Sequence, residues 1–564
     1  MGSSISGNDK TIYYLISMLK AYGIKNIVAS PGMQNSKFNA VVQEDDFFSC
    51  YSVVDERSAA YFATGISYET TQSVVITCTG ATASRNYLSA LTEAYYRKIP
   101  IIAITFYNSA HNDFNLSPQY VDRKSIQNDI SYISVNLPKI SEASDKEMVL
   151  TMLNVALFEA VYKNCPVHIN CPSSFIYDDV FKVKLPTDIW TTKYYEDEFS
   201  ELKSELCDKR FAVFVGAHHK FKEKEQCALS EFAKSYDIPV LCDHTSNYHG
   251  VNKVLISQFV SRIERTDFPE LMIDIGEICG EYAFYGLFEK SKLWRISEDG
   301  VFKCRRSKPV ENFFNCKESY FFELLKSNNT VRDGYYSSIK ANLACEPELD
   351  LPLSNVFVCS QLAKYIPNNS SLHLAILNSL RSMNYFNLDE SIDVNCNVGG
   401  FGIDGPVSTI IGQSVANPDK KCFGVIGDLA FFYDMNALGL RHLGDNLRLI
   451  IINNNRGEEF RLNQLLEKSL CNKTDKLIAA AGHYKKGVED WAKSCGFTYL
   501  KATTKAEFST QIESFCSKDY KAPVLFEVFT TNEDEQLGLE RIKKKPTKNV
   551  IKNVIKVLKS VVKK

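Results

Sequence analysis

Two polar clusters in the last third of the chain carry oxygen ligands of the kind that a magnesium ion prefers. The first is Gly427-Asp428, and the second is Asn453-Asn454-Asn455, followed two residues later by Gly457. Mg²⁺ favours octahedral oxygen ligands, which are supplied by carboxylates, amide and backbone carbonyls, water and phosphates. Asp428, the side chain of Asn455 and the carbonyl of Gly457 could supply three of them. The clusters therefore predict a site for magnesium and a diphosphate.

Both clusters follow directly on apolar runs that are typical of buried strands, at residues 423–426 and 449–452. The carboxyl ends of parallel strands meet at one edge of a sheet, and ligands bind beyond that edge. A helix that starts after Asp428 would direct its partial positive charge at an anion, and Gly427 would let phosphates approach the backbone. Either cluster alone would more often be an ordinary turn, but their spacing and strand context together favour a ligand site.

The elements that must position these clusters recur along the chain, where strands alternate with helical stretches in three successive segments. Near-continuous apolar runs of this kind suit parallel strands that are covered on both faces. We therefore expect an α/β protein of three doubly wound parallel-sheet domains. The expected strands lie at residues 26–30, 73–78, 100–105, 211–215, 239–242, 271–275, 422–426 and 447–452, with a helix at 83–97. The expected domains cover residues 1–190, 191–348 and 349–540, followed by a basic tail at 541–564.

Composition and charge limit the class of protein. With 564 residues, the chain exceeds what one hydrophobic core usually organises. The formal net charge of −2 gives no electrostatic argument for nucleic-acid binding, so no nucleic-acid partner is expected. The 17 cysteines are scattered without the spacing of a zinc site. No secretory signal or membrane-spanning apolar run is recognisable, so we predict a cytoplasmic protein with free thiols.

The basic tail, residues 541–564, contains ten Lys and Arg residues and no Asp or Glu. A basic amphipathic helix suits an anionic membrane surface or a partner protein, which would place the protein peripherally at the inner membrane face. The alternatives are a frayed tail or a helix that packs back on the acidic remainder of the chain. The apolar side chains that recur at helical spacing are Val550, Ile551, Val554, Ile555, Leu558, Val561 and Val562.

The two clusters resemble the signature of the thiamine-diphosphate enzyme superfamily, in which Gly-Asp is followed further along the chain by Asn-Asn. In this sequence Asp428 and Asn455 lie 27 positions apart. Within this superfamily the chain is most similar to the MenD family, the 2-succinyl-5-enolpyruvyl-6-hydroxy-3-cyclohexene-1-carboxylate (SEPHCHC) synthases of menaquinone biosynthesis. The resembling motifs occur in the right order from residue 30 to residue 460. They are Ser30-Pro31-Gly32, residues 54–60, Cys78-Thr79 with Thr82 and Asn86, residues 166–172, Gly402-Ile403-Asp404-Gly405 with Ser408-Thr409, Gly427-Asp428-Leu429 with Tyr433-Asp434, Asn453-Asn454-Asn455 and Phe460.

The resemblance implies a pyrimidine-binding domain, a central domain and a diphosphate-binding domain, together with thiamine diphosphate and Mg²⁺ as cofactors. It also implies a homodimer or homotetramer, because the family's cofactor lies between two subunits. Ile403 matches the large aliphatic residue that holds the family's cofactor in its bent form, although it could equally be a core residue. The implied cofactor-binding residues are Thr79, Asn86, Gly402, Ile403, Asp404, Gly427, Asp428, Leu429 and Asn455, and the implied metal ligands are Asp428, Asn455 and Gly457.

Glu56 matches the family's catalytic glutamate, which forms a hydrogen bond with the N1′ atom of the aminopyrimidine. A carboxylate in an apolar pocket suits the proton relay that activates the cofactor. The alternative is a carboxylate at a helix N-terminus beside Asp55, where the helix dipole would favour it without any catalytic role.

The substrate positions depart from the family's pattern. Met33-Gln34 replace a Ser-Arg pair, residues 107–109 replace Asp-Arg-Pro, Val398 replaces an arginine, and Glu459 replaces an isoleucine. Each mismatched charge contact could cost roughly 2–5 kcal/mol of binding. We therefore expect a less anionic substrate than the family's 2-oxoglutarate and isochorismate. The expected substrate-contacting residues are Met33, Gln34, Gln119, Arg381, Glu459 and Phe460.

The sequence thus predicts a 2-oxo acid decarboxylase and carboligase that transfers the acyl unit of a small 2-oxo acid donor to an unidentified acceptor. An activated sugar of surface-polysaccharide biosynthesis is one candidate acceptor, in place of the menaquinone reaction. Three alternatives stay open: a genuine SEPHCHC synthase of menaquinone biosynthesis, a simple 2-oxo acid decarboxylase or acetolactate-synthase-like enzyme, and a catalytically retired scaffold. Retention of both Glu56 and the metal ligands argues against the scaffold.

Overall fold

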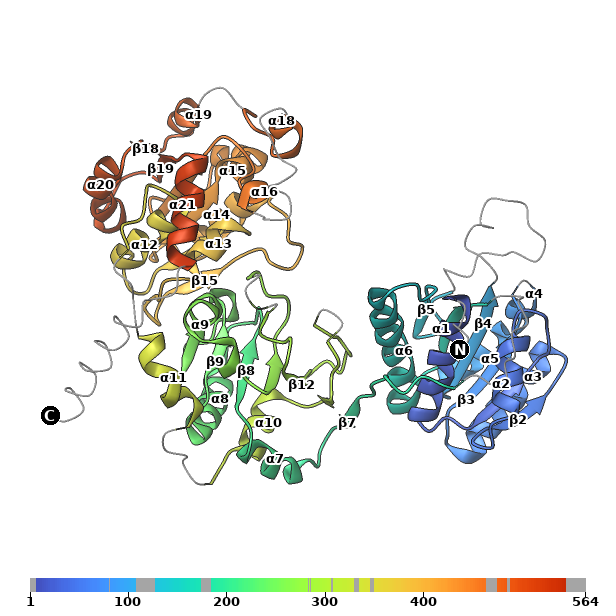
Figure 1. Cartoon of the computed structure of the whole chain (residues 1–564). Helices are drawn as coiled ribbons and strands as arrows, with labels where there is room; N and C mark the ends of the chain where they lie inside the picture. Colours follow the sequence, from blue (N-terminus) through green and yellow to red (C-terminus); the bar gives the residue numbers. More distant parts are fainter. Residues whose placement is uncertain are drawn as a thin grey trace, which may run out of the picture. The chain divides into compact units, whose positions relative to one another are not determined.

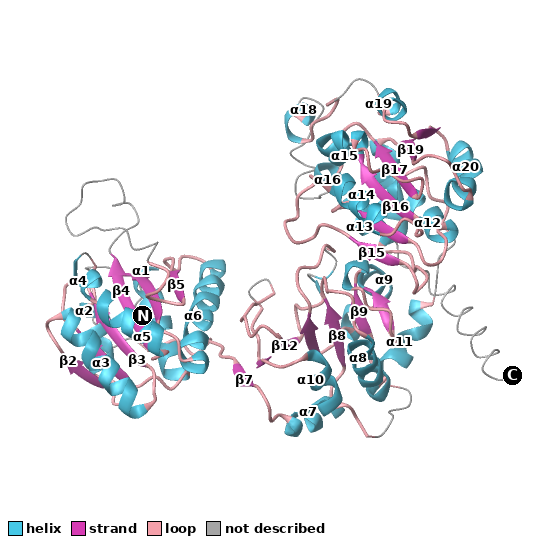
Figure 2. Ribbon diagram, turned by 180° about the vertical axis from the view of Figure 1, so that it is seen from behind, coloured by secondary structure: helices cyan, strands magenta, loops and turns pink. Residues whose placement is uncertain are grey.

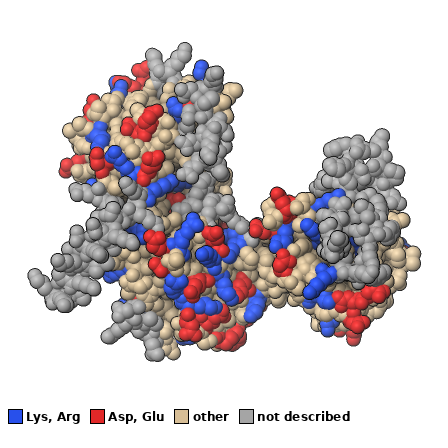
Figure 3. Space-filling view, in the orientation of Figure 1, with Lys and Arg blue, Asp and Glu red and all other residues tan. Residues whose placement is uncertain are grey.

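The computed structural model of the 564-residue chain describes residues 7–80, 82–107, 127–173, 184–281, 284, 286–305, 308–328, 334–344, 349–462, 474–483 and 487–543. The chain divides into two compact units, Met1–Asp197 with Leu293–Asn315 and Glu198–Lys292 with Cys316–Lys564, and each is described by itself. Figures 1 and 2 show helices on both faces of the strands that form the sheets. On the face drawn in Figure 3, basic and acidic side chains lie intermixed on each unit.

The first unit contains a six-stranded sheet of parallel strands in the order β2-β1-β3-β4-β6-β5. In β3, Val75 faces a core shared with α1 and α6, whereas Val74 and Ile76 face a core shared with α3 and α5. The strand is apolar along its whole length because helices cover both of its faces. The strands are β1 (Asn26–Ala29), β2 (Ser49–Ser52), β3 (Val74–Cys78), β4 (Ile101–Tyr107), β5 (Ile133–Asn136) and β6 (Val167–Pro172), and the helices are α1 (Gly7–Ala21), α2 (Ser36–Gln43), α3 (Glu56–Thr70), α4 (Thr82–Asn86), α5 (Leu88–Arg97) and α6 (Ala143–Lys163).

A second six-stranded parallel sheet lies in the second unit, in the order β15-β14-β16-β17-β19-β18. In β16, Phe423 and Val425 face a core with α12 and α20, whereas Cys422 and Ile426 face a core with α14 and α15. The strands are β14 (Ser371–Leu374), β15 (Asp393–Asn395), β16 (Cys422–Gly427), β17 (Leu447–Asn453), β18 (Thr498–Ala502) and β19 (Val524–Phe529). The helices are α12 (Asn355–Tyr365), α13 (Asn378–Met383), α14 (Pro406–Ala416), α15 (Asp428–Asp434), α16 (Glu459–Leu462), α18 (Asp475–Ile478), α19 (Glu489–Ser494), α20 (Lys505–Ser517) and α21 (Asn532–Lys543).

Seven further strands form two groups, and each group belongs almost wholly to one unit. In the second unit four strands follow the order β10-β9-β8-β11, and in the first unit three strands follow the order β12-β13-β7. The strands are β7 (Lys193–Tyr195), β8 (Phe211–Val215), β9 (Val240–Cys242), β10 (Lys253–Leu255), β11 (Leu271–Ile275), β12 (Lys292–Ile296) and β13 (Asn312–Phe314). The helices around them are α7 (Lys203–Cys207), α8 (Glu223–Tyr236), α9 (Ile256–Arg262), α10 (Glu318–Leu325) and α11 (Tyr335–Leu343).

The prediction of three parallel sheets flanked by helices is confirmed. The expected helix at 83–97 is interrupted, because α4 ends at Asn86 and α5 begins at Leu88, with the buried Tyr87 between them. The predicted domain boundaries stay a prediction. Of the predicted basic tail, residues 541–543 form the end of α21. The rest of the tail, with the predicted amphipathic helix, lies outside the described residues. No helix in the described ranges has both the length and the apolarity to span a membrane.

Candidate functional site

The two polar clusters lie side by side at the carboxyl edge of the sheet in the second unit. β16 ends at Gly427 and β17 ends at Asn453, and the parallel pairing of these strands sets Gly427 opposite Ile452. The residues that follow each strand, Asp428 and Asn455, therefore leave the sheet at the same edge. The spacing argument from the sequence placed them correctly.

Asp428 is buried, with 1% of its surface exposed, at the first residue of α15. Its Oδ1 accepts a hydrogen bond from the backbone N–H of Leu429 at 2.8 Å. Among the described residues, Oδ2 has no hydrogen-bond partner of normal geometry. Burial raises the pKa of this carboxyl to about 7, although the backbone N–H groups of Leu429, Asn455 and Arg456 act to lower it. A buried carboxylate oxygen without a partner fits a divalent cation, which would satisfy its charge.

The turn that carries Asn455 is fixed by its neighbours. Asn453 donates from Nδ2 to Glu527 Oε1 at 2.6 Å and accepts the N–H of Asn455 on Oδ1 at 3.1 Å. Asn455 has a φ of 56°, in the left-handed region that asparagine tolerates better than most residues. The N–H of Gly457 donates to the carbonyl of Ala479 at 2.6 Å. The backbone is thus held in one conformation beside Asp428.

Glu527 supports this turn through Asn453, and the sequence analysis did not predict it. It lies fully buried in β19, where it also accepts hydrogen bonds from the N–H of Val488 at 3.1 Å and the hydroxyl of Tyr499 at 2.7 Å. The signal was available in the sequence, since Glu527 is the one acidic residue in the apolar run 524–529. A buried carboxylate of this kind must be hydrogen-bonded, and here it secures Asn453.

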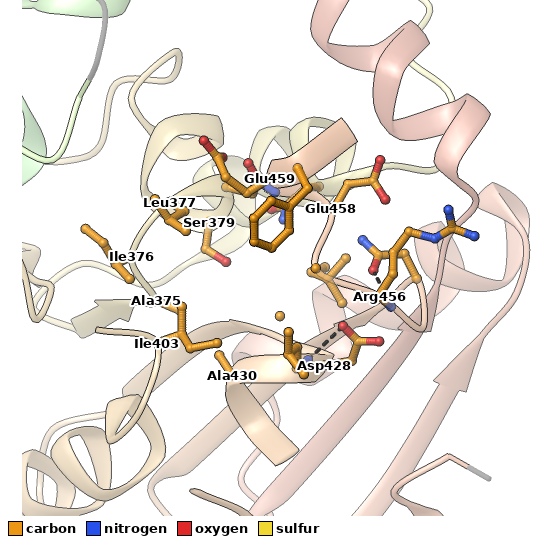
Figure 4. A pocket seen from close by; sticks show the side chains of 18 residues that line it. Ala375, Ile376, Leu377, Ser379, Ile403, Asp428, Ala430, Arg456, Glu458 and Glu459 are labelled. Carbon is orange, nitrogen blue, oxygen red and sulfur yellow. Dashed lines mark hydrogen bonds between the residues drawn. The ribbon is translucent and has the colours of Figure 1, made fainter. Parts of the chain in front are cut away.

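A cavity of about 200 Å³ opens beside Asp428. Figure 4 shows Ile403 and Asp428 on one side of it and Glu458 and Glu459 on the other. The predicted residues that line it are Ile403, Gly427, Asp428, Leu429, Gly457, Glu459 and Phe460. One cavity thus unites predicted metal, cofactor and substrate residues from four separate motifs.

Three predicted cofactor residues of this unit, Gly402, Asp404 and Asn455, do not line this cavity. Their neighbours Ile403 and Asn454 do. A Cβ atom at position 402 would come within 2.4 Å of Asp404 Oδ1, so only glycine leaves room for that carboxylate. The following helix, α14, is capped by Asp434, whose carboxylate accepts the N–H and the hydroxyl of Ser408, both at 2.6 Å. Gly402 and Asp404 therefore shape the loop that delivers Ile403.

The donor set around Asp428 suits a hard cation. No group of three or more His, Cys, Asp or Glu side chains with metal-binding geometry occurs within the described ranges. A site with one carboxylate completed by amide, carbonyl and phosphate oxygens suits a hard cation such as Mg²⁺ better than a metal that prefers nitrogen or sulfur ligands. Asp428, Asn455 and Gly457 therefore fit a magnesium diphosphate, and the space at Gly457 is restricted by the Phe460 ring, which a Cβ would meet at 3.3 Å.

Glu56 is the first residue of α3 in the first unit and is half-buried. The capping role at this helix belongs to its neighbour Asp55, which accepts the N–H of Arg57 at 3.0 Å and the hydroxyl of Ser58 at 3.1 Å. The Glu56 carboxylate therefore has no part in the side-chain cap. It lies within electrostatic range of the buried Tyr87, and burial raises the pKa of the Tyr87 hydroxyl, with Cys78 adding to the effect.

Other predicted residues of the first unit lie in two loops, at residues 32–34 and 79–80, that contact each other. Gln34 is buried, and its Oε1 accepts the N–H of Gly80 at 2.9 Å. A Cβ at Gly32 would come within 2.4 Å of the Thr79 side chain, so glycine is required for these two loops to touch. Met33 is 59% exposed.

Of the two remaining predicted residues of the first unit, the structure describes Asn86 but not Gln119. Asn86 is exposed and donates from Nδ2 to the carbonyl of Thr82 at 3.2 Å. Gln119 lies outside the described residues, as do Asn108 and Ser109.

Arg381 and Glu459, both predicted to contact substrate, pair with each other. Arg381 Nη1 donates to Glu459 Oε1 at 2.7 Å and to Oε2 at 2.6 Å. The sequence named both residues but gave no reason to expect this contact, because 78 positions separate them.

Magnesium binding at Asp428 is expected to release a proton near neutral pH. Since burial raises the pKa of Asp428 to about 7, this carboxyl is largely protonated below pH 7 until a cation binds. The apparent Mg²⁺ affinity should therefore fall by up to about tenfold per pH unit below 7 and level off above it. Calorimetric titration of Mg²⁺ in the presence of the diphosphate cofactor, in buffers of different ionisation enthalpy, measures the affinity and the released protons together. An affinity independent of pH across this range would contradict the placement of the cation on Asp428.

The chain is similar to known proteins over its N-terminal part and over nearly its whole length. Residues 10–133 match the family model of the thiamine pyrophosphate enzyme N-terminal TPP binding domain. The chain is 29% identical to the 2-succinyl-5-enolpyruvyl-6-hydroxy-3-cyclohexene-1-carboxylate synthase of Phocaeicola vulgatus, over 94% of this chain and 97% of the relative. Synthases of the same name from Bacteroides fragilis and Flavobacterium johnsoniae are 28% and 27% identical, and each match covers 94% of this chain and 98% of the relative.

Proposed function

Since this chain is a thiamine-diphosphate-dependent enzyme, homologous to the SEPHCHC synthases over nearly its whole length, we propose that it decarboxylates a 2-oxo acid and transfers the remaining acyl unit to an acceptor. The observation that carries the proposal is the buried Asp428 at the edge of a cavity, whose Oδ2 has no hydrogen-bond partner of normal geometry in the part of the chain that the structure describes. A retired scaffold would have no need to keep a buried carboxylate with an incompletely satisfied oxygen there, because such a group costs folding stability.

The roles of the individual residues follow from their positions. Asp428, with the side chain of Asn455 and the carbonyl of Gly457, would hold Mg²⁺ and through it the diphosphate. Glu56 would hold a proton at the pyrimidine N1′ atom, for which its freedom from the helix cap leaves it available. Ile403 would form the aliphatic wall against the cofactor. When bound, thiamine diphosphate supplies the carbon nucleophile that a 2-oxo acid needs in order to lose CO₂.

The comparisons favour the reaction named for the relatives over the predicted polysaccharide reaction, for which they offer no support. We therefore take SEPHCHC synthesis as the first reaction to test and a simple decarboxylase as the second. The departures at Met33, Val398 and Glu459 leave the preferred donor as a separate question.

The test supplies purified protein with thiamine diphosphate and Mg²⁺, and then with a panel of 2-oxo acids, each with and without isochorismate. Released CO₂ and the mass of any adduct are measured. Adduct formation from 2-oxoglutarate and isochorismate would support the synthase, and CO₂ release without an adduct would support the simple decarboxylase. Failure to release CO₂ from every donor, together with failure to bind thiamine diphosphate, would overturn the proposed function.

We further propose that the enzyme works as a cytoplasmic homodimer or homotetramer, as the resemblance implies. Light scattering coupled to size exclusion measures its mass in solution. A mass corresponding to one chain, in the presence of both cofactors, would contradict this proposal.

The basic tail is expected to attach the protein to anionic membranes. If the predicted helix forms, the eight lysines beyond Lys543 would accompany an apolar stripe, and they should gain electrostatic and hydrophobic free energy at such a surface. Co-sedimentation with vesicles of phosphatidylglycerol should pellet the full chain but not a chain that ends at Lys543, the last residue of α21. Neutral phosphatidylcholine vesicles are the control. Equal binding of the two chains to the anionic vesicles would remove the membrane role.

A further inference from the structure

The contact between Arg381 and Glu459 links two elements at the edge of the cavity. Arg381 lies on α13 and Glu459 is the first residue of α16. Only 15% of the Arg381 side chain and 20% of the Glu459 side chain are exposed. A charge-assisted pair of this kind, with two short distances and little solvent, is stronger than a typical surface ion pair. Glu459 also lines the cavity that contains Asp428.

Two further charged residues of opposite sign, Lys543 and Glu281, lie near the pair. Lys543, at the end of α21, interacts electrostatically with Glu281, Arg381 and Glu459. Glu281 is buried and is held by the hydroxyl of Ser257 at 2.6 Å and Asn384 Nδ2 at 3.3 Å. Among the described residues, this cluster thus contains two cations and two anions, so the cluster itself carries no net positive charge for a substrate carboxylate.

We propose that Glu459 acts as an internal carboxylate that occupies Arg381 and thereby selects donor 2-oxo acids whose side chain carries no second carboxylate. This inference rests on the general part of the proposed function, the decarboxylation of a 2-oxo acid. It does not rest on SEPHCHC synthesis, whose donor 2-oxoglutarate carries a second carboxylate. Glu459 lines the cavity and Arg381 does not. A dicarboxylic donor would therefore lie beside the negative charge of Glu459, or would have to displace Glu459 in order to reach Arg381. Both alternatives cost binding free energy, whereas an uncharged donor side chain meets neither cost.

The test compares 2-oxoglutarate with 2-oxobutyrate, which differ in the second carboxylate, in the wild type and in Glu459→Gln. Removal of the internal carboxylate should raise the ratio of kcat/KM for 2-oxoglutarate over 2-oxobutyrate by more than about tenfold. Binding is measured separately with glutarate and butyrate, which lack the oxo group and do not react. Calorimetry should show tighter glutarate binding by a similar factor, with little change for butyrate.

Three further variants separate pairing from general electrostatics. Glu281→Gln removes an equal charge from the same cluster without uncoupling Arg381, so it should change the ratio much less. Glu459→Asp keeps the carboxylate and should stay near the wild-type ratio. The double variant with Arg381→Gln and Glu459→Gln should lose most of the gain of the single variant, because Arg381 is no longer there to be freed and Lys543 is the one cation of the cluster that remains.

The outcomes separate this inference from the proposed function. A folded Glu459→Gln protein with an unchanged ratio and unchanged glutarate affinity would overturn the inference, as would an equal change in Glu281→Gln. If no donor releases CO₂ but Glu459→Gln still binds glutarate more tightly than the wild type, the selection by Glu459 stands and the proposed function fails. Thermal unfolding of every variant establishes that it is folded.

Discussion

Replacement of Glu56 by glutamine is expected to lower CO₂ release from the preferred 2-oxo acid by about 10²–10⁴-fold. Glutamine keeps the size of the side chain but cannot hold a transferable proton at the pyrimidine nitrogen. Binding of thiamine diphosphate should change far less, because we propose that the residues around Asp428, and not Glu56, hold the diphosphate and the metal. Single-turnover assays of CO₂ release, with cofactor affinity measured separately, distinguish the two effects.

The neighbouring Asp55 provides a matched control for this result. It caps α3 through the N–H of Arg57 and the hydroxyl of Ser58. Asp55→Asn keeps an acceptor oxygen, and it should reduce stability by no more than about 1 kcal/mol. Its turnover should remain near that of the wild type. Equal loss of activity in both variants, or an active Glu56→Gln, would reduce Glu56 to a helix-terminal carboxylate.

The second large effect is expected for Asp428→Asn, which should weaken the Mg²⁺-dependent binding of thiamine diphosphate by about 100-fold or more. Asparagine preserves the acceptor for the N–H of Leu429 but removes the negative charge that the cation needs. Fluorescence or calorimetric titration of the cofactor at saturating Mg²⁺ measures the loss.

The same variant should not destabilise the cofactor-free protein. The pKa of Asp428 is raised from 3.8 to about 7 by burial, so ionisation of this group opposes folding. Its unfavourable contribution grows as the pH rises from about 4 to about 7 and is fully present above that range. At pH 8 the Asn variant avoids it, so its Tm should match or exceed that of the cofactor-free wild type. The rise in Tm on adding cofactor should be lost.

Asp434 is the appropriate comparison, because it lies on the same helix and caps α14 through Ser408. Asp434→Asn should lower Tm while the cofactor still raises it. If both variants bound the cofactor as the wild type does, the cation would have to be placed elsewhere.

The sequence predicted the sheets and the edge of the site because these depend on local patterns. The runs that became β16 and β17 are apolar on both faces, which required parallel strands under two layers of helices. Parallel pairing then places Asp428 and the turn at Asn455 at one edge without any further information. Glu56 was found through its motif and not through periodicity.

The contacts that the sequence did not predict join residues that are distant along the chain. The Arg381–Glu459 pair and the Asn453–Glu527 bond each span more than 70 positions, and no local pattern encodes such distances. Glu527 could have been suspected, since an acid within an apolar strand must find partners. The contact of Arg381 with Glu459 could not have been suspected, because an arginine on a short helix can equally well point into solvent.

The buried Glu527 has a consequence for how this site tolerates change. Through it, Tyr499 on the edge strand β18 and Val488 in a distant loop are coupled to Asn453 and thus to the turn beside Asp428. Loss of the Tyr499 hydroxyl would leave a buried carboxylate short of one donor, and the turn would have to relax to compensate. If this turn holds the metal as we propose, a substitution at the periphery of this sheet, far from the cavity, should change the affinity for the cofactor.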